Sequence, residues 1–116
     1  MDEPYFIRPG EGERVASRGH RVLAELPHIE ALEISYGPDF EGVDPHTHAD
    51  HADCFYVLDG LAEFTVDGET LRAGPGSFVA APIGTVHGFR NAGDGELRML
   101  NIHAPTTGFA DRMRRA

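Results

Sequence analysis

The sequence predicts an all-β protein that folds as one sandwich or barrel, and three observations lead to this fold class. Fourteen Gly and eight Pro divide the 116 residues into short pieces, which leaves no room for a series of long helices before position 105. The β-rich runs between them recur roughly every eight to twelve residues, a spacing typical of sandwiches and barrels. A chain of this length can bury one modest core, so we expect a single domain over residues 1–116.

The expected strands follow one another along the chain with turn residues between them. They cover residues 21–26, 29–36, 54–58, 62–66, 69–72, 77–81, 85–90 and 97–103. Asp59-Gly60, between the third and fourth strands, is a dipeptide typical of β-hairpins, and Asp67-Gly68 marks a second turn. The tail differs, because Thr106 or Thr107 can cap a short helix over residues 108–116, with three Arg near its C-terminal end.

The composition excludes several classes of function. A formal net charge of -9 disfavours binding to nucleic acid or to an anionic membrane, and no apolar stretch approaches the length of a membrane-spanning helix. All ten basic residues are Arg, so a Schiff-base lysine and a phosphate-binding lysine are both absent. A small-molecule ligand is the partner that we expect.

The compartment and the oligomeric state follow from simple features. Cys54 is the one cysteine and cannot form an intramolecular disulfide, and the N-terminus opens with acids where a secretory signal would be basic and then apolar. We therefore expect a cytoplasmic protein. A barrel this small leaves strand edges exposed, so we also expect a homodimer joined through strands such as residues 21–36.

Three of the seven histidines, His46, His48 and His51, fall within six residues. Alternate residues of a strand share a face, so His46 and His48 would point in one direction and Thr47 in the other. This arrangement is typical of two ligands of a metal site. An isolated pair of this kind is also common on protein surfaces, so the rest of the spacing has to decide.

The spacing around these histidines resembles the two motifs of the cupin family. The first motif reads G-x5-H-x-H-x(3 or 4)-E-x6-G, and the chain matches it at both histidines and the closing glycine, over about residues 42–60. Two positions depart from it, because Asp53 stands in place of Glu and Phe40 holds the Gly position, with Gly42 two residues too close to His46. The second motif, G-x5-P-x-G-x2-H-x3-N, matches at every fixed position over residues 76–91.

The resemblance implies a double-stranded β-helix, or jelly-roll, barrel whose open interior holds one divalent metal ion per chain. Its implied ligands are His46, His48, Asp53 and His87. Three imidazoles and one carboxylate suit Fe, Mn, Ni, Cu or Zn, and the lack of a thiolate argues against a closed structural zinc site. Water would complete the shell and leave an open position for a substrate or for oxygen.

The shorter side chain of Asp53 leaves three arrangements open. The carboxylate could bind the metal through water, the strand could shift to restore a direct bond, or His51 could replace it. His51 has the wrong parity to share a face with His46 and His48, so we expect it to be exposed or to lie behind the ligands.

Side-chain parity also predicts the walls of the cavity. Phe55 and Val57 share a face with Asp53, Phe89 shares one with His87, and one face of the last strand carries Met99, Asn101 and His103. The predicted substrate-binding residues are Phe55, Phe89, Met99, Asn101 and His103. Cys54 should face away as a buried and inert thiol, and the resemblance gives Asn91 the role of fixing the turn after its strand.

Three functions fit these features. The first is a mononuclear metal-dependent enzyme of oxygenase, isomerase or decarboxylase type that acts on a small organic molecule. The second is a non-catalytic module that binds a metal or a small metabolite, and the third is a barrel with a vestigial site. The sequence shows no second acid–base pair and no evident Arg clamp for a substrate carboxylate, so it names no catalytic residue beyond the implied ligands.

Overall fold

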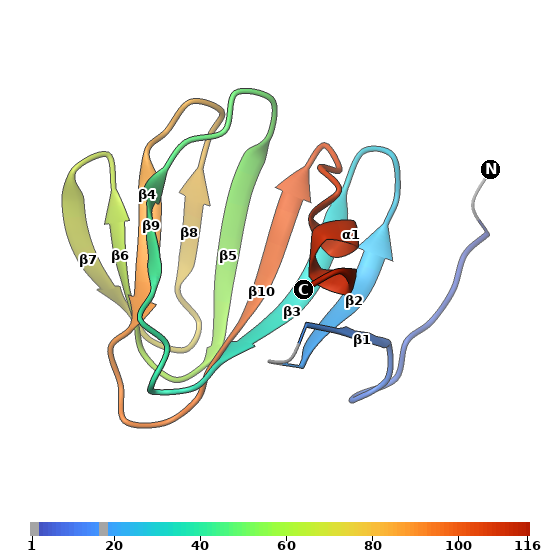
Figure 1. Ribbon diagram of the computed structural model, residues 1–116, viewed down its shortest axis with the longest axis horizontal. Coiled ribbons are helices and arrows are strands. Elements are labelled where there is room, and N and C mark those ends of the chain that lie inside the picture. Colours follow the sequence, from blue (N-terminus) through green and yellow to red (C-terminus); the bar gives the residue numbers. More distant parts are fainter. Residues whose placement is uncertain (1–2, 17–18) are drawn as a thin grey trace.

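The computed structural model describes residues 3–16 and 19–116, which form two antiparallel β-sheets and one short helix (Figure 1). The six-stranded sheet has the order β1-β2-β3-β10-β5-β8, and the four-stranded sheet has the order β4-β9-β6-β7. This is the all-β, double-stranded β-helix architecture that the sequence predicts, with the expected C-terminal helix. No helix in the described residues is long and apolar enough to cross a membrane.

The elements have the following bounds: β1 Glu13–Val15, β2 His20–Glu25, β3 Glu30–Tyr36, β4 Val43–His46, β5 Ala52–Asp59, β6 Ala62–Val66, β7 Glu69–Ala73, β8 Phe78–Ala81, β9 His87–Asn91, β10 Leu97–Ala104 and α1 Phe109–Arg114. The expected strands are all present with ends that differ by up to two residues. Two short strands, β1 and β4, are additional to them.

The core lies between the two sheets. Strands β3 and β10 alternate between buried and half-buried residues, because a sheet with one face on the core turns every second side chain inward. Leu32, Met99 and Phe64 are each 0% exposed. On β10 the buried face carries Met99, Asn101 and His103, as the sequence predicts.

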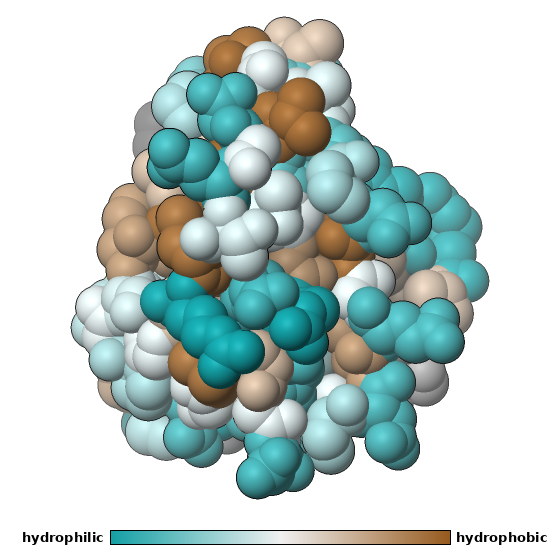
Figure 2. All heavy atoms as spheres, turned by 90° about the vertical axis from the view of Figure 1, so that its left-hand side faces the viewer, coloured by the Kyte–Doolittle hydropathy of each residue, from teal (hydrophilic) through white to brown (hydrophobic). Residues whose placement is uncertain are grey.

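The outer face of the four-stranded sheet is polar. Figure 2 shows the side of the molecule on which β6 and β7 lie, where hydrophilic side chains gather near the middle of the face with hydrophobic patches around them. Across the strands, a carboxylate oxygen of Glu63 lies 2.9 Å from Nε of Arg90 and the other lies 3.6 Å from Nε of Arg72. Arg90 therefore points away from the barrel interior, as its parity predicts.

The predicted hairpin at Asp59-Gly60 is wrong. Strand β5 pairs with β10 and β8, whereas β6 pairs with β7 and β9, so this turn carries the chain from one sheet to the other. Gly60 has a φ of 89°, and a Cβ there would lie 2.5 Å from the carbonyl oxygen of Glu96. This close approach requires the glycine. The turn at Asp67-Gly68 does form a hairpin, between β6 and β7.

Helix α1 is held mainly by a buried carboxylate from β3 rather than by the predicted threonine cap. Gly108 occupies the N-cap position. Glu30, which is 0% exposed, accepts hydrogen bonds from the backbone N–H groups of Thr107 at 3.1 Å and Ala110 at 3.0 Å. The hydroxyl of Thr107 donates to the same carboxylate and accepts from the N–H of Phe109, so this threonine assists the cap without occupying its position.

The ionisation of Glu30 follows from these contacts. Burial acts to raise the pKa of Glu30, but the hydrogen bonds from Ala110 and Thr107 outweigh it and hold the pKa below the ordinary value of 4.5. The charged carboxylate therefore stabilises the folded state at pH values above 4.5, and this contribution is lost as the pH falls through the lower folded-state pKa.

Glu30→Gln should lower the free energy of unfolding at pH 7 by about 1–3 kcal/mol, because the amide replaces a charged acceptor and leaves buried N–H groups poorly bonded. Urea denaturation should show this difference at pH 7 and a smaller one in acid, where the wild-type carboxylate is protonated. Glu69→Gln, at an exposed position on β7, is the matched control and should change stability by less than about 0.5 kcal/mol. Equal stability of wild type and Glu30→Gln at pH 7 would contradict the capping role.

Candidate metal centre

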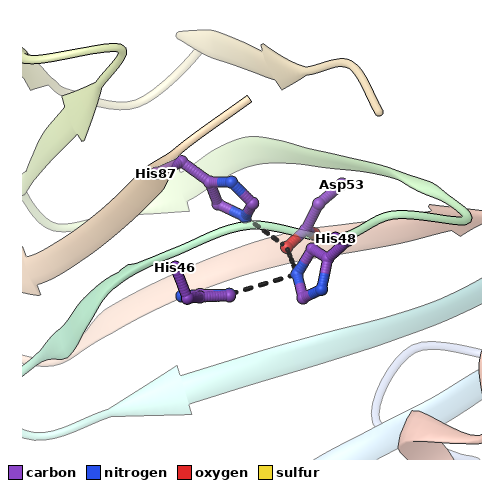
Figure 3. Close-up of side chains that lie close together, drawn as sticks. All are labelled: His46, His48, Asp53 and His87. Atoms are coloured by element: carbon purple, nitrogen blue, oxygen red, sulfur yellow. Dashed lines mark hydrogen bonds and ion pairs between the residues drawn. The ribbon is translucent and has the colours of Figure 1, made fainter. Parts of the chain in front are cut away.

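Four side chains from two separate stretches of the sequence meet inside the barrel (Figure 3). They are His46 at the end of β4, His48 just beyond it, Asp53 on β5 and His87 at the start of β9. One nitrogen or carboxylate oxygen from each lies within 4.8 Å of all the others. The structure thus brings together the four ligands that the family resemblance implies.

The pairing of β4 with β9 places two of these histidines side by side. His46 and His87 are register partners. The two backbones approach closely, because a Cβ on Gly88 would lie 2.5 Å from the carbonyl oxygen of Val43. Strand β4 ends at His46, so His48 is not in a continuous strand with it, but Thr47 is still exposed and the two imidazoles still point the same way.

Backbone carbonyl groups orient two of the rings. Nδ1 of His46 lies 2.9 Å from the carbonyl oxygen of Asp44, and Nδ1 of His87 lies 2.9 Å from that of Thr85. A carbonyl group can only accept, so each Nδ1 carries the proton that it donates. This leaves Nε2 of both rings available to a ligand, the arrangement that metal-binding histidines need.

The distances between the four groups fit a single ion. Nε2 of His46 lies 3.1 Å from Nε2 of His48, and Oδ2 of Asp53 lies 3.4 Å from Nε2 of His48 and 2.9 Å from Nε2 of His87. Adjacent ligands about 2.1 Å from one ion would be about 3 Å apart. Imidazole and carboxylate groups also form a suitable donor set for a divalent transition metal.

Asp53 presents one oxygen to the centre while its other oxygen is held from behind. Oδ1 accepts a hydrogen bond of 2.7 Å from the amide of Asn101 and lies 3.2 Å from Nε2 of His103. Burial acts to raise the pKa of Asp53, but the hydrogen bonds from His103, His87 and Asn101 outweigh it and hold the pKa well below its usual range. The carboxylate is therefore ionised, as a metal ligand must be.

The histidines differ in how strongly they hold a proton. Burial acts to lower the pKa of His87, but its hydrogen bonds to Asp53 and Thr85 outweigh burial and raise it. Burial and the neighbouring His51 lower the pKa of His48. Positive charge is thus attracted to the pair of His87 and Asp53, where a proton and a metal ion would compete.

His51 is buried, which is one of the two positions that its parity predicts. The side chain packs beside the four-residue cluster, with its ring centroid 4.0 Å from that of His48 and its Nδ1 2.8 Å from a carboxylate oxygen of Asp50. His51 is only 6% exposed. It is not among the four groups that converge.

A cavity of about 110 Å³ adjoins the cluster. Four of the predicted substrate-binding residues line it, namely Phe55, Phe89, Asn101 and His103, whereas Met99 lies in the core and does not. Sequence reasoning missed Phe109 and Arg112, which reach the cavity from α1. The pattern of the tail predicts a helix but nothing about which of its faces covers the barrel opening, so no signal within the sequence could have identified these two.

The sequence also predicts structural roles for Asn91 and Cys54. The amide of Asn91 donates to the carbonyl oxygens of Tyr36 at 3.2 Å and Gly95 at 2.9 Å, which ties the loop after β9 to β3. Cys54 is half-buried rather than fully buried, and burial and the nearby Asp53 raise the pKa of its thiol. A thiol with a raised pKa is a poor nucleophile near neutral pH, as expected for an inert cysteine.

Comparison of the sequence with known proteins gives one family and several relatives. A family model described as "Cupin domain" matches residues 32–103. Quercetin 2,3-dioxygenase from Bacillus subtilis is 33% identical over 92 residues, which cover 75% of this chain and 27% of that enzyme. Polyketide synthase CurC from Streptomyces cyaneus is 42% identical over 62 residues, or 52% of this chain and 39% of that protein. The chain therefore spans less than half the length of either relative.

Solved structures show the same fold. KdgF from Halomonas sp. superposes with a TM-score of 0.81 at 23% identity, and the match covers 90% of this chain and 96% of that one. A predicted oxalate decarboxylase from Thermotoga maritima gives 0.75 at 18% identity, with 87% and 99% covered. An RmlC-like cupin from Shewanella frigidimarina gives 0.75 at 19% identity, with 91% and 96% covered. Identities this low support the fold alone.

His87→Ala should abolish stoichiometric metal binding, because it removes one of the four converging groups. The barrel should stay folded, because the backbone pairing of β9 with β4 and β6 does not involve the imidazole. Elemental analysis of protein purified without a metal-affinity tag measures the metal, and circular dichroism measures the fold. His28→Ala is the matched control, since His28 is exposed and outside the cluster. A folded His87→Ala protein with one metal per chain and unchanged affinity would show that the ligand assignment is wrong.

Proposed function

The chain belongs to the cupin family, and from this premise we propose that it is a mononuclear metal-dependent enzyme acting on a small organic molecule. The observation that carries the proposal is the convergence of three imidazoles and one ionised carboxylate within 4.8 Å beside a lined cavity. A closed structural site would need no such cavity. The cavity would admit a substrate to the open side of the cluster.

The side chains of the site would have different roles. Nε2 of His46, His48 and His87 and Oδ2 of Asp53 would hold a divalent Fe, Mn, Ni, Cu or Zn ion, which when bound supplies a Lewis acid or a site for oxygen. Asn101 and His103 keep Asp53 oriented through its Oδ1. His51 and His103 also line the cavity, so their imidazoles could donate or accept a hydrogen bond toward a bound molecule.

The cavity limits the size and polarity of the substrate. Its volume of about 110 Å³ is well below the ~300–1,000 Å³ of pockets that hold drug-sized ligands. Phe55, Phe89 and Tyr36 form an apolar wall that excludes water from one side of the site, with ring centroids of Phe89 5.4 Å from those of both others. A small molecule with a polar end and an apolar body fits these surroundings.

We propose oxygenase, isomerase or decarboxylase chemistry for this site. Two similar proteins carry such descriptions, the quercetin 2,3-dioxygenase from Bacillus subtilis and the predicted oxalate decarboxylase from Thermotoga maritima. Their names suggest the first assays for this chain. The chain matches only 27% of the first protein and shares 18% identity with the second, so the reaction itself remains a proposal.

A non-catalytic binding module is the second candidate, and one observation favours it. In the described part of the chain, Asp53 is the only carboxylate that lines the cavity, and both of its oxygens are already engaged. No additional acid is therefore available there as a general base. The binding module would use the same metal and the same cavity without turnover.

The test of the proposed function is reconstitution of the metal-free protein with each of the five metals, followed by assays for oxygen uptake and carbon dioxide release. Candidate substrates are small hydroxy and oxo acids and phenols. We expect multiple turnovers with one metal and none without metal or with His87→Ala. Stoichiometric metal and ligand binding without turnover would instead support the binding module, and loss of metal binding altogether would leave a vestigial site.

We further propose that the protein is a cytoplasmic homodimer. The edge near β2 supports the dimer, because the short β1 pairs only with residues 20–22 of β2 and because Phe6 and Ile29 are exposed. An edge of this kind is suited to cover by a second copy. Sedimentation at micromolar concentration should give the mass of two chains, and a monomer there would contradict the proposal.

Asp53→Glu should retain the metal and lower turnover. The longer side chain advances the carboxylate by about 1.5 Å, which would partly fill the open position that a substrate or water atom needs. Elemental analysis and the assay above measure the two effects, and Asp94→Glu, which lengthens an exposed acid outside the four-residue cluster and its neighbours, is the control. A metal-free Asp53→Glu protein would contradict this view and point to His51 or another group as the fourth ligand.

A further inference from the structure

We propose that the ligand of this cavity is a small carboxylic acid and that Arg112 binds its carboxylate group. The inference rests on the proposed function, because it names the substrate class of the same site. Sequence reasoning found no arginine clamp, and the structure supplies a candidate from the C-terminal helix. Four features support this assignment: the position of Arg112, its lack of a carboxylate partner among the described residues, the charge of the cavity and the anchoring of α1.

Arg112 is connected to the candidate metal centre by contacts through Phe109 and His103. It lines the same cavity as His46, His48 and Asp53. The Cζ atom of Arg112 lies 5.6 Å from the ring centroid of Phe109, and this ring lies 5.1 Å from that of His103 in an edge-to-face arrangement. His103 in turn contacts Asp53. The guanidinium group and the candidate metal ligands therefore belong to one continuous wall.

Arg112 is also free to bind an external anion. Most other arginines of the described residues are engaged by carboxylates: Arg21 and Arg98 by Glu33, Arg72 and Arg90 by Glu63, and Arg114 by Glu13, Glu25 and Asp111. Arg112 forms no ion pair within the described part of the chain. Acids outnumber bases by nineteen to ten in this protein, so an arginine without a carboxylate partner at a cavity is informative.

The charge inside the cavity favours an anion. Asp53 is the only acid that lines it within the described residues, and this single negative charge is outweighed by a divalent ion together with Arg112. The rest of the protein is acidic, with a net charge of -9. A locally positive, partly enclosed site retains a small anion even where the surface as a whole repels one.

The shape of the site favours a carboxylate over a phosphate. A guanidinium group matches a carboxylate with two parallel hydrogen bonds, and the Phe109 ring beneath it supports its planar face. Phosphate is usually bound by several donors together, whereas Arg112 is the only Arg that lines this cavity among the described residues. The small volume of the cavity also suits a short acid.

The helix holds Arg112 in a fixed position. Glu30 binds the N–H groups at the start of α1, and Ala110 packs into the core with 0% exposure. Arg114 fixes the end of the helix through its contacts with Glu13 and Glu25 on β1 and β2. A binding group on an anchored element loses less freedom when the ligand binds, which increases affinity.

The experiment uses the full chain loaded with Co²⁺, with pyruvate, its neutral amide pyruvamide and inorganic phosphate as probes. Dissociation constants come from calorimetry and from the visible spectrum of the cobalt, neither of which needs turnover. We expect pyruvate to bind more tightly than pyruvamide or phosphate. Arg112→Gln should weaken pyruvate binding roughly tenfold to a hundredfold, as for loss of a charge-assisted bond, and should barely change pyruvamide binding.

Two variants make the test specific. Arg115→Gln removes the same charge from an exposed residue at the end of the same helix that does not line the cavity, so it should leave both affinities nearly unchanged. Arg112→Lys keeps the charge but not the paired hydrogen bonds, so its pyruvate affinity should fall between those of the wild type and Arg112→Gln.

Each other outcome overturns the inference. If Arg112→Gln and Arg115→Gln weaken pyruvate binding equally, the effect is one of overall charge and not of a specific Arg112 contact. If phosphate binds more tightly than pyruvate, the site is one for phosphorylated ligands. Wild-type protein that loads with cobalt but binds no pyruvate would also overturn it while leaving the metal site intact. Failure to bind cobalt or any of the five proposed metals would overturn the proposed function, and this inference with it.

Discussion

A buried row of polar groups, from Asp53 through His103 to Glu30, joins the candidate metal ligands to the C-terminal helix. Nε2 of His103 lies 3.2 Å from Asp53 and its Nδ1 lies 3.3 Å from Glu30. All three are at most 4% exposed, and a buried charge is destabilising unless it is paired. Changing either end removes a buried polar partner of His103, so the cluster, the last strand and the helix beside the cavity depend on one another.

The sheet register produces this row. Strand β10 lies between β3 and β5, and His103 is the direct register partner of Glu30 on one side and of Asp53 on the other. Asn101, two residues earlier, faces the same way and is opposite Phe55. A shift of β10 by one residue would turn both polar side chains to the outer face. The pairing of the last strand is thus the structural requirement for an oriented Asp53.

Much of this arrangement could be predicted from local rules, and the rest depends on contacts between distant residues. Side-chain parity paired His46 with His48 and placed Asn101 and His103 inward, and the resemblance of the motifs to the cupin family implied Asp53 and His87 as the other two ligands. The Asp59-Gly60 prediction failed because a positive φ is needed equally by a hairpin and by a crossing between sheets. Glu30 was overlooked because an acid in an alternating strand resembles a surface residue, and its role exists only once α1 docks. Arg112 is recognisable only after the same docking.

The family model matches residues 32–103, whereas α1 lies beyond that range and supplies Phe109 and Arg112 to the cavity. The strands that hold the four converging groups and the segment that closes the opening above them are therefore separate stretches of the chain. Related barrels could keep the same candidate metal ligands and change ligand preference by altering only the segment after Ala104. For protein engineering, the segment after Ala104 is therefore a part to exchange, provided that its replacement still donates hydrogen bonds to the buried carboxylate of Glu30.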